Sequence, residues 1–461
     1  MDKEVVDLLI LGGSVLTMNN RFEVFDEGGV ATKGDKIVGV GPADTVANQF
    51  AAARTINARR HIVMPGLIDS HFHTGQQFER GLPYELRKTG RLQEPVWQHV
   101  SIPFEGVLSD EDVYLSALFA YCTLLKGGTT CFCEAGGPRP ELMAPALELT
   151  GIRGILARST LDLRQNIPPE MHDTPEASIE KGRRLFKEWN GRAGGRIRVW
   201  MAMRQIMICS RDLVTQIHQL AAELHTSIHI HLAEEHSEVD WAVAHSGLRP
   251  AEYLESIGFL GPNVHAAHSV FLSDRELDLY EQYNVSVAHC PFVAFAFCGP
   301  TRVPEMLRRG IRVGLGSDGA PTGNPDLFRQ LHLCHLGLMA SFGIPYHNPA
   351  PILPDDLLRL ATIGGAKAIS WDEEIGSLEP GKKADLIILS REELDLLCPY
   401  DPVYAAAHVV DGADVRTVVV DGRVVVDDGR LVNVNEDELR EKIEDRAPQI
   451  VSRFLKRMQA T

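Results

Sequence analysis

The sequence lacks the long apolar runs that cross membranes. No stretch approaches the roughly 20 consecutive apolar residues that span a bilayer, and the first four residues include two acids where a secretory leader would be basic. Hydrophobic residues make up 44% of the chain and charged residues 23%, close to the averages for soluble globular proteins. These features predict a cytoplasmic protein with no membrane partner.

The sequence also lacks an excess of basic residues. Lys and Arg number 46 against 62 Asp and Glu, which gives a formal net charge of -16 at pH 7. Nucleic-acid binding relies on clustered Lys and Arg that neutralise backbone phosphates, so this balance argues against a nucleic-acid partner. The acidic balance is more compatible with a neutral or cationic small-molecule substrate.

Cysteine is too sparse for a disulfide framework. Eight cysteines occur among 461 residues, and in a reducing compartment most should be free and buried. Cys131 and Cys133 are separated by one residue, whereas zinc ribbons use a two-residue gap and a second pair. We interpret this pair as part of the packing of a strand.

Short runs rich in β-branched residues and glycine-containing turns lie near both ends of the chain. We predict that they pair into one small β-sandwich domain, built from residues 1–60 and 375–435, with the central region inserted between them. A capped helical tail over residues 436–461 should follow, interrupted at Pro448 because proline lacks the N–H that a helix needs. The β-rich runs are 7–17, 28–42, 384–390, 415–422 and 423–430.

The central region, residues 61–374, alternates short apolar runs with helix-like segments, as parallel β/α units do. Eight such runs predict an α/β fold with a closed (β/α)8 TIM-type barrel. An open doubly wound sheet usually has fewer strands and a glycine-rich phosphate turn after the first, which is absent from this sequence. The runs are 64–73, 129–136, 152–160, 197–207, 227–235, 263–272, 285–291 and 311–319.

Residues that can bind a metal stand at the ends of several predicted strands. His71 and His73 are two apart in an extended segment and therefore point to the same side. His231 and Asp318 lie near the ends of the fifth and eighth runs. Barrel active sites are built at the carboxyl ends of the strands, so we expect these side chains to converge. Three imidazoles and one carboxylate suit zinc or ferrous iron, with a position left open for water.

Two further residues are candidates for proton transfer. Glu234 lies three residues beyond His231, where it could take a proton from the water and pass it to a leaving group. His268, at the end of the sixth strand, could orient the water or polarise the bond that breaks. Asp318 could instead cap the following helix. A lone histidine on a strand is usually a core residue, and we apply that interpretation to His229, His265 and His289.

These motifs resemble the amidohydrolase superfamily, in particular its deaminase and chlorohydrolase branch, which includes guanine, S-adenosylhomocysteine and triazine deaminases and hydrolases. The resemblance implies metal ligands at His71, His73, His231 and Asp318, and proton transfer by Glu234 with help from His268 and Asp318. It covers nearly the whole chain. The motifs are PGLIDSHFH (65–73), HLAE (231–234), HAAH (265–268), HCP (289–291), GSDG (316–319) and GSLEPGKKADL (376–386).

The resemblance also indicates a single metal ion. Two-metal members of the superfamily bridge their ions through a carboxylated lysine at the fourth strand, and the sequence has no lysine between Lys187 and Lys367. Cys209, just past the fourth strand, could be the bridge in a rarer two-metal variant. We therefore expect one divalent ion per chain, with zinc preferred and iron as the alternative.

The sequence departs from the branch after the HCP motif. Purine and triazine deaminases usually continue with small polar residues, including an Asn, whereas residues 292–297 read FVAFAF. Phe292 and Phe295 would line a pocket for an apolar or aromatic group, or they would pack beneath the loop. The other candidate substrate contacts are Gln77, Arg80, Glu105 and His289.

The predicted reaction is hydrolysis of a C–N bond by metal-activated water. Deamination of a heteroaromatic or cyclic amidine compound, such as a purine, pterin or triazine, is the leading prediction. Dechlorination, or hydrolysis of a urea, carbamate or amide on an apolar substrate, is the alternative among enzymes. A catalytically silent binding protein is the alternative from another class. We also expect a homo-oligomer, either a dimer or a tetramer.

Overall fold

A barrel of eight parallel strands forms the larger part of the computed structural model, which describes residues 3–163, 167–320, 323–397 and 401–460. Neighbouring strands in the barrel are also neighbours in the sequence. Each strand lies within one of the eight predicted runs, which confirms the (β/α)8 prediction. The strands are β6 (Leu67–Phe72), β7 (Thr129–Glu134), β8 (Arg153–Arg158), β9 (Ile197–Met203), β10 (Ile228–Leu232), β11 (Val264–His268), β12 (Ser286–His289) and β13 (Val313–Leu315).

The first and last barrel strands, β6 and β13, meet through contacts at their carboxyl ends. Ser70 Oγ donates to the carbonyl of Leu315 at 2.8 Å, and the Asp318 N–H donates to the carbonyl of His71 at 3.0 Å. Glycine permits this approach, because a Cβ on Gly314 would lie 2.8 Å from Ser70 Oγ. The closure therefore brings His71 and Asp318 together.

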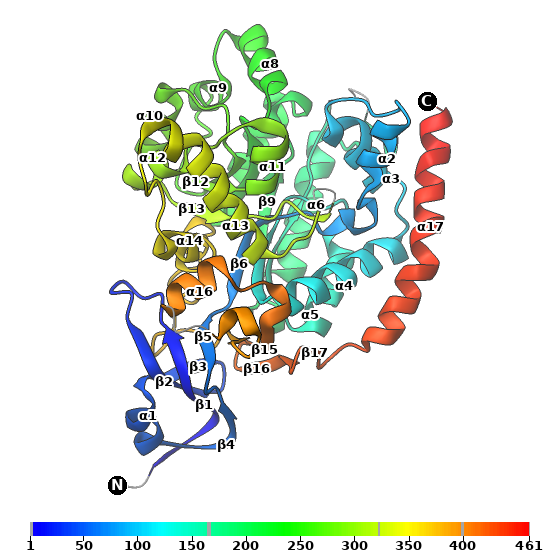
Figure 1. Cartoon of the computed structure of the whole chain (residues 1–461). Coiled ribbons are helices and arrows are strands. Elements are labelled where there is room, and N and C mark those ends of the chain that lie inside the picture. Colours follow the sequence, from blue (N-terminus) through cyan, green and yellow to red (C-terminus); the bar gives the residue numbers. More distant parts are fainter. Residues whose placement is uncertain (1–2, 164–166, 321–322, 398–400, 461) are drawn as a thin grey trace.

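Helices surround the barrel, and short helical segments follow β6 and β12 at its carboxyl end (Figure 1). Ser109 caps α4: its hydroxyl accepts the Asp112 N–H while the Asp112 carboxylate accepts the Ser109 N–H. The helices are α4 (Asp110–Lys126), α5 (Pro140–Thr150), α6 (Pro175–Trp189), α7 (Arg211–Glu223), α8 (His236–Ser246), α9 (Pro250–Ser256), α10 (Asp274–Tyr283), α12 (Val303–Arg308), α13 (Leu327–Leu338), α14 (Pro354–Leu360), α15 (Ile363–Ala368) and α16 (Pro402–His408). The segments over the carboxyl end are η1 (Thr74–Glu79), α2 (Leu82–Lys88), η2 (Trp97–Ser101), α3 (Ile102–Gly106), α11 (Pro291–Val293) and η6 (Ala294–Cys298).

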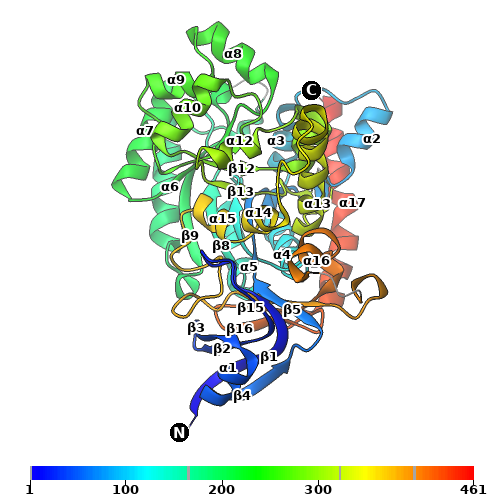
Figure 2. The ribbon, with the colours of Figure 1, turned by 60° about the vertical axis from the view of Figure 1, so that its left-hand side comes forward.

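The smaller part is one sheet of nine strands, built from both ends of the chain and lying below the barrel in Figure 2. Strand β14 pairs antiparallel with β5, and Ile388 lies opposite Val63. Side chains from both halves share one buried core, which confirms that the two ends form a single β domain. The elements are β1 (Glu4–Leu16), β2 (Val24–Lys33), β3 (Lys36–Pro42), α1 (Ala43–Gln49), β4 (Phe50–Asn57), β5 (His61–Pro65), β14 (Leu386–Ser390), β15 (Val415–Val420), β16 (Arg423–Asp427) and β17 (Arg430–Leu431).

Arg153, the first residue of β8, joins the barrel to this sheet. Its side chain is fully buried and donates to Asp385 from Nε at 2.7 Å and from Nη2 at 3.0 Å. Nη2 also donates to Asp421 at 3.0 Å. Asp385 precedes β14 and Asp421 follows β15. This ion network therefore lies at the amino end of the barrel, opposite the strand ends that carry the candidate site.

The C-terminal helix α17 (Glu436–Ala460) runs along the side of the barrel (Figure 1). Asn435 caps it by accepting the Asp437 N–H at 3.1 Å, as expected. The predicted interruption at Pro448 is wrong, because the helix continues through that residue. Contacts beyond the proline hold the next turns: Phe454 is fully buried, with its ring centroid 5.5 Å from that of Phe104. This burial offsets the backbone hydrogen bond that proline cannot make.

Two exclusions made from the sequence can be compared with the structure. Within the described ranges, no helix is long and apolar enough to cross a membrane. Cys131 and Cys133 are free thiols, completely buried on β7. The interpretation of this pair as strand packing is confirmed.

Candidate active site

Four predicted side chains meet at the carboxyl end of the barrel. One ligand atom from each of His71, His73, His231 and Asp318 lies within 4.8 Å of the others. His71 Nε2 is 2.8 Å from Asp318 Oδ1, and His73 Nε2 is 3.1 Å from His231 Nε2. The structure thus brings together residues from β6, β10 and the segment after β13.

Burial keeps these imidazoles neutral, and a hydrogen bond fixes the tautomer of His231. His231 Nδ1 donates to the Arg204 carbonyl at 2.9 Å, since a carbonyl oxygen can only accept. In the neutral ring, Nε2 of His231 then presents a lone pair to the cluster. Burial, reinforced by Arg204, lowers the pKa of His71 to about 3, and burial holds the pKa values of His73 and His231 well below their usual range. Neutral imidazoles gathered beside a carboxylate fit a divalent cation.

Two of the candidate residues adopt unusual backbone conformations. His268 has φ of 68° and Asp318 has φ of 62°, both in the left-handed region that side chains other than glycine rarely occupy. Such conformations cost roughly 1–3 kcal/mol each and persist where the surroundings enforce them. For Asp318 the bond from its N–H to His71 provides that constraint. The conformation turns the Asp318 carboxylate toward the histidines.

Glu234 and His268 lie beside the four-residue cluster. Glu234 Oε1 is 3.6 Å from His268 Nε2, and Glu234 Oε2 accepts a hydrogen bond from Gln205 Nε2 at 2.8 Å. Burial, followed by the neighbouring Glu235, Asp318 and Glu238, raises the pKa of Glu234 well above its usual range. Burial also raises the pKa of Asp318 to about 6, against the opposing effects of His268 and Arg204. A cation at the cluster would offset this crowding of acids.

A cavity of about 490 Å³ opens onto these residues. Its apolar walls come from the segments that follow β6, β11 and β12: Pro83, Leu92, Val96, Trp97, Phe271, Val293, Ala296, Phe297 and Cys298. Its polar lining includes His73, Gln76, Arg204, Gln205, His231, Glu234 and Asp318. Arg87, Glu94 and Glu235 also line it, so the cavity combines apolar walls with charged groups of both signs.

The loop after β6 places Gln77 and Arg80 outside this cavity lining. Gln77 Nε2 donates to the carbonyl of His73 at 3.2 Å, which fixes the loop. The Arg80 guanidinium lies 5.4 Å from the centroid of the Phe119 ring. The neighbouring Gln76 lines the cavity instead.

The phenylalanines of residues 292–297 differ in position: one lines the cavity and the others do not. Phe295 packs with its ring centroid 5.9 Å from that of His289, which is fully buried, and neither residue lines the cavity. Phe292 also lies outside the lining, 6.0 Å from Phe297 between ring centroids. Phe297 does line the cavity and is 50% exposed. One aromatic ring of this loop thus faces the space for substrate.

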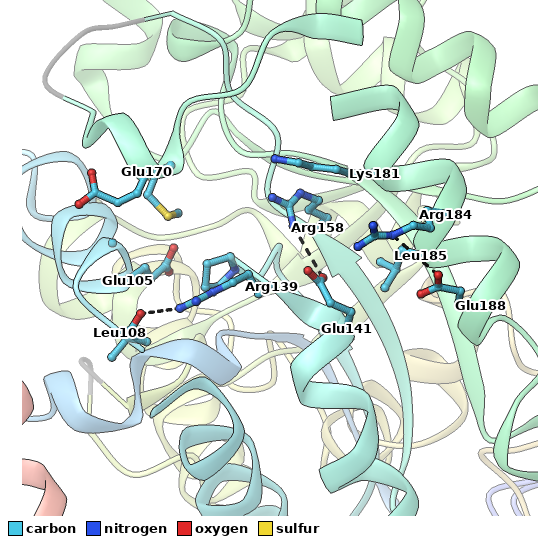
Figure 3. A pocket seen from close by; sticks show the side chains of 13 residues that line it. Glu105, Leu108, Arg139, Glu141, Arg158, Glu170, Lys181, Arg184, Leu185 and Glu188 are labelled. Carbon is cyan, nitrogen blue, oxygen red and sulfur yellow. Dashed lines mark hydrogen bonds and ion pairs between the residues drawn. The ribbon is translucent and has the colours of Figure 1, made fainter. Parts of the chain in front are cut away.

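Glu105 lies between this cavity and a second one. It accepts a hydrogen bond from Gln76 Nε2 at 2.7 Å and pairs with Arg204 Nη1 at 3.2 Å, and both partners line the cavity beside the four-residue cluster. Glu105 itself lines the other cavity, of about 400 Å³, in which Arg158 points to Glu141 and Arg184 to Glu188 (Figure 3). Four basic and four acidic side chains line that cavity, so their charges balance.

Sequence reasoning missed Arg204 and Gln205. They directly follow β9, the fourth barrel strand, and both are buried beside the four-residue cluster. The rule that singled out His268 and Asp318, a polar residue at the carboxyl end of a barrel strand, would have identified them too. Gln76 carries no comparable signal, because its position depends on how η1 turns.

Buried carboxyl groups behind the site predict that stability falls as the pH rises. Burial raises the pKa of Glu79 from 4.5 to about 8, although Ser101 donates to it. The folded state therefore retains a proton that the unfolded chain loses above about pH 4.5. This contribution is complete below pH 4.5 and is lost as the pH approaches 8. In thermal unfolding at pH 6 and pH 9, Glu79→Gln should show a smaller drop in Tm than the parent protein.

An exposed carboxylate provides the control for this measurement. Glu85 pairs with Lys88 at the surface, and its side chain is 65% exposed. Glu85→Gln should show the same pH dependence of Tm as the parent protein. An equal drop in Tm for Glu79→Gln and the parent would contradict the prediction.

Comparisons with known proteins agree with these motifs. A sequence profile described as "Amidohydrolase family" matches residues 62–425. The chain is 34% identical over 449 residues to a 5-methylthioadenosine/S-adenosylhomocysteine deaminase of Syntrophobacter fumaroxidans, covering 96% of this chain and 98% of the relative. It is 32% identical to a 5'-deoxyadenosine deaminase of Methanobrevibacter smithii, covering 90% and 92%.

A solved structure shares the fold. An adenosine deaminase from Xanthomonas campestris with bound zinc has a TM-score of 0.89 and 24% identity, and the match covers 99% of this chain and 100% of that one. The profile and the curated relatives confirm the resemblance to the deaminase branch that the motifs indicated. On this evidence the chain belongs to the amidohydrolase family.

Proposed function

We propose that this protein removes the 6-amino group of an adenosine-type nucleoside by hydrolysis. As a member of the amidohydrolase family it is a hydrolase of carbon–nitrogen bonds. The observation that carries the proposal is the convergence of four ligand atoms within 4.8 Å, with Glu234 beside them in the same cavity. The curated relatives named as deaminases of adenosine-type compounds support the choice of substrate class.

We further propose a single divalent ion held by His71, His73, His231 and Asp318. When bound, the ion supplies Lewis acidity that makes a water molecule a better nucleophile. Zinc is favoured by the histidine-rich donor set and by the zinc in the similar Xanthomonas campestris structure. Cys209 does not join the cluster, since its thiol donates to the Thr160 carbonyl at 3.3 Å.

The side chains of the site can make the proton transfers of this reaction one after another. Glu234 takes a proton from the attacking water as the oxygen bonds to C6 and the electron pair of the C6=N1 bond moves to N1. Glu234 then delivers this proton to N1. His268 Nε2, 3.6 Å from Glu234 and 4.0 Å from Asp318, contacts the attacking oxygen. Asp318 takes the second proton of the water and passes it to the amino nitrogen, so that ammonia leaves and a C6=O, N1–H lactam remains.

A release assay tests the proposal. The zinc-loaded protein should release ammonia from adenosine, 5'-deoxyadenosine or 5'-methylthioadenosine, and the absorbance should change as the aminopurine becomes an oxopurine. Chelation should abolish the activity, and one equivalent of zinc should restore it. Adenine, guanine, a pterin and a chlorotriazine complete the panel. Release of ammonia from none of the three nucleosides would contradict the substrate assignment. Two ions per active chain by metal analysis would contradict the single-ion proposal.

A further inference from the structure

Gln205 occupies a position between the metal-ligand cluster and the cavity. It is 2% exposed, and it lines the cavity together with Glu234. The carbonyl of the preceding residue, Arg204, accepts the hydrogen bond that orients His231. The backbone here is therefore tied to the cluster, and the Gln205 side chain has little freedom to move away.

The two ends of the Gln205 amide have different surroundings. Nε2 lies 2.8 Å from Glu234 Oε2. The proposed proton transfer requires the ionised form of Glu234, which only accepts hydrogen bonds, so in that form the NH2 group of Gln205 faces Glu234 and the amide oxygen faces away. Oε1 is buried and has no hydrogen-bond partner among the residues that the structure describes. A buried acceptor without a donor is costly, which suggests that its partner is a bound molecule.

The reaction itself creates a suitable donor. A ring nitrogen that receives its proton from Glu234 must come within about 2.6–3.2 Å of that carboxylate. Oε1 belongs to the amide that touches the same carboxylate, so it lies within about 5 Å of it. N1 of a 6-aminopurine carries no hydrogen. After water has added to C6, N1 carries one, and it keeps it in the product.

We propose that Gln205 is a specificity-determining residue whose Oε1 accepts the N1–H formed during the reaction, while its Nε2 positions Glu234. This inference rests on the proposed function. The contact exists in the intermediate and the product but not in the substrate, so it contributes to the chemical step more than to substrate binding. It also selects rings in which the nitrogen beside the reacting carbon bears no substituent.

Binding of the product and of its N-methyl derivative tests the acceptor role directly. Inosine has an N1–H, and 1-methylinosine does not. By calorimetry, the zinc-loaded protein should bind inosine at least about tenfold more tightly than 1-methylinosine. In Gln205→Met, which keeps the volume but offers only a weakly accepting thioether sulfur, this ratio of Kd values should fall about tenfold, with zinc content unchanged.

A matched control and a second variant complete the experiment. Gln216 also donates to a carboxylate, that of Asp212 at 2.9 Å, but on the outer surface of α7. Gln216→Met should leave the ratio unchanged. Gln205→Glu keeps an acceptor and loses the amide donor, so it should retain the preference for inosine while kcat falls and KM changes little.

The outcomes separate this inference from the proposed function. An unchanged Kd ratio in zinc-loaded Gln205→Met would overturn the acceptor role while leaving the deaminase assignment intact. If Gln205→Met does not fold, loss of the inosine preference in Gln205→Glu would overturn it instead. A parent protein that neither binds inosine nor releases ammonia from the nucleosides would overturn both.

Discussion

Glu234→Gln is expected to lower kcat by roughly 10²–10⁴-fold. The glutamine amide matches the shape of the carboxylate but cannot take a proton from the attacking water. Glu234 is outside the four-residue ligand set, so the variant should bind as much metal as the parent protein. Ammonia release measured alongside metal content tests both parts of this expectation.

A surface glutamate serves as the control for this substitution. Glu223, at the end of α7, pairs with Arg183 at the surface, and its side chain is 57% exposed. Glu223→Gln should have the kcat of the parent protein. Near-normal turnover in metal-loaded Glu234→Gln would remove Glu234 from the mechanism.

Arg153→Met should lower the free energy of unfolding by about 3–5 kcal/mol, because it leaves buried charge without its partner. Asp385 is 4% exposed and loses both of its hydrogen bonds from the guanidinium, and Asp421 loses one. The network lies at the amino end of the barrel, so the catalytic geometry should survive. We expect urea unfolding at a lower denaturant concentration, with kcat retained at low temperature.

An exposed ion pair in the same sheet calibrates this effect. Arg54 contacts Asp427 at 2.8 Å, between the two ends of the chain, with side chains 47% and 48% exposed. Solvent screens such a pair, so Arg54→Met should change the free energy of unfolding by less than about 1 kcal/mol. Equal unfolding midpoints for Arg153→Met and Arg54→Met would show that burial adds nothing to the network.

Much of the barrel could be predicted because its signal is local. Each strand is a short apolar run, and a strand's two-residue period forces His71 and His73 to the same side. The carboxyl ends of parallel strands meet at one edge, so residues distant in sequence, such as His231 and Asp318, could be brought together without knowing any loop. The domain limits at residues 60, 374 and 435 remain our proposal, and the cytoplasmic location and the homo-oligomer remain predictions.

The cavity walls could not be predicted, because they depend on irregular backbone. Gln76 and Gln77 are neighbours of the same type, yet the turn of η1 sends one to the cavity and the other to the His73 carbonyl. Among the aromatic residues after the HCP motif, the π-helical turn η6 places Phe297 at the cavity, while Phe295 packs against His289. The prediction that Pro448 interrupts the C-terminal helix failed for a similar reason. It considered only the proline itself and not the burial of Phe454 in the turns that follow it.

The sheet built from both chain ends has a consequence for the order of synthesis. Strand β5 finds its partner β14 only after roughly 320 further residues have been made, because the barrel lies between Pro65 and Leu386. At about 5–20 residues per second, a ribosome needs roughly 15–60 s for that stretch. During this time one edge of β5 stays unpaired on the nascent chain, and such an edge can recruit other strands. This edge of β5 is therefore open to pairing with other chains until β14 has been synthesised.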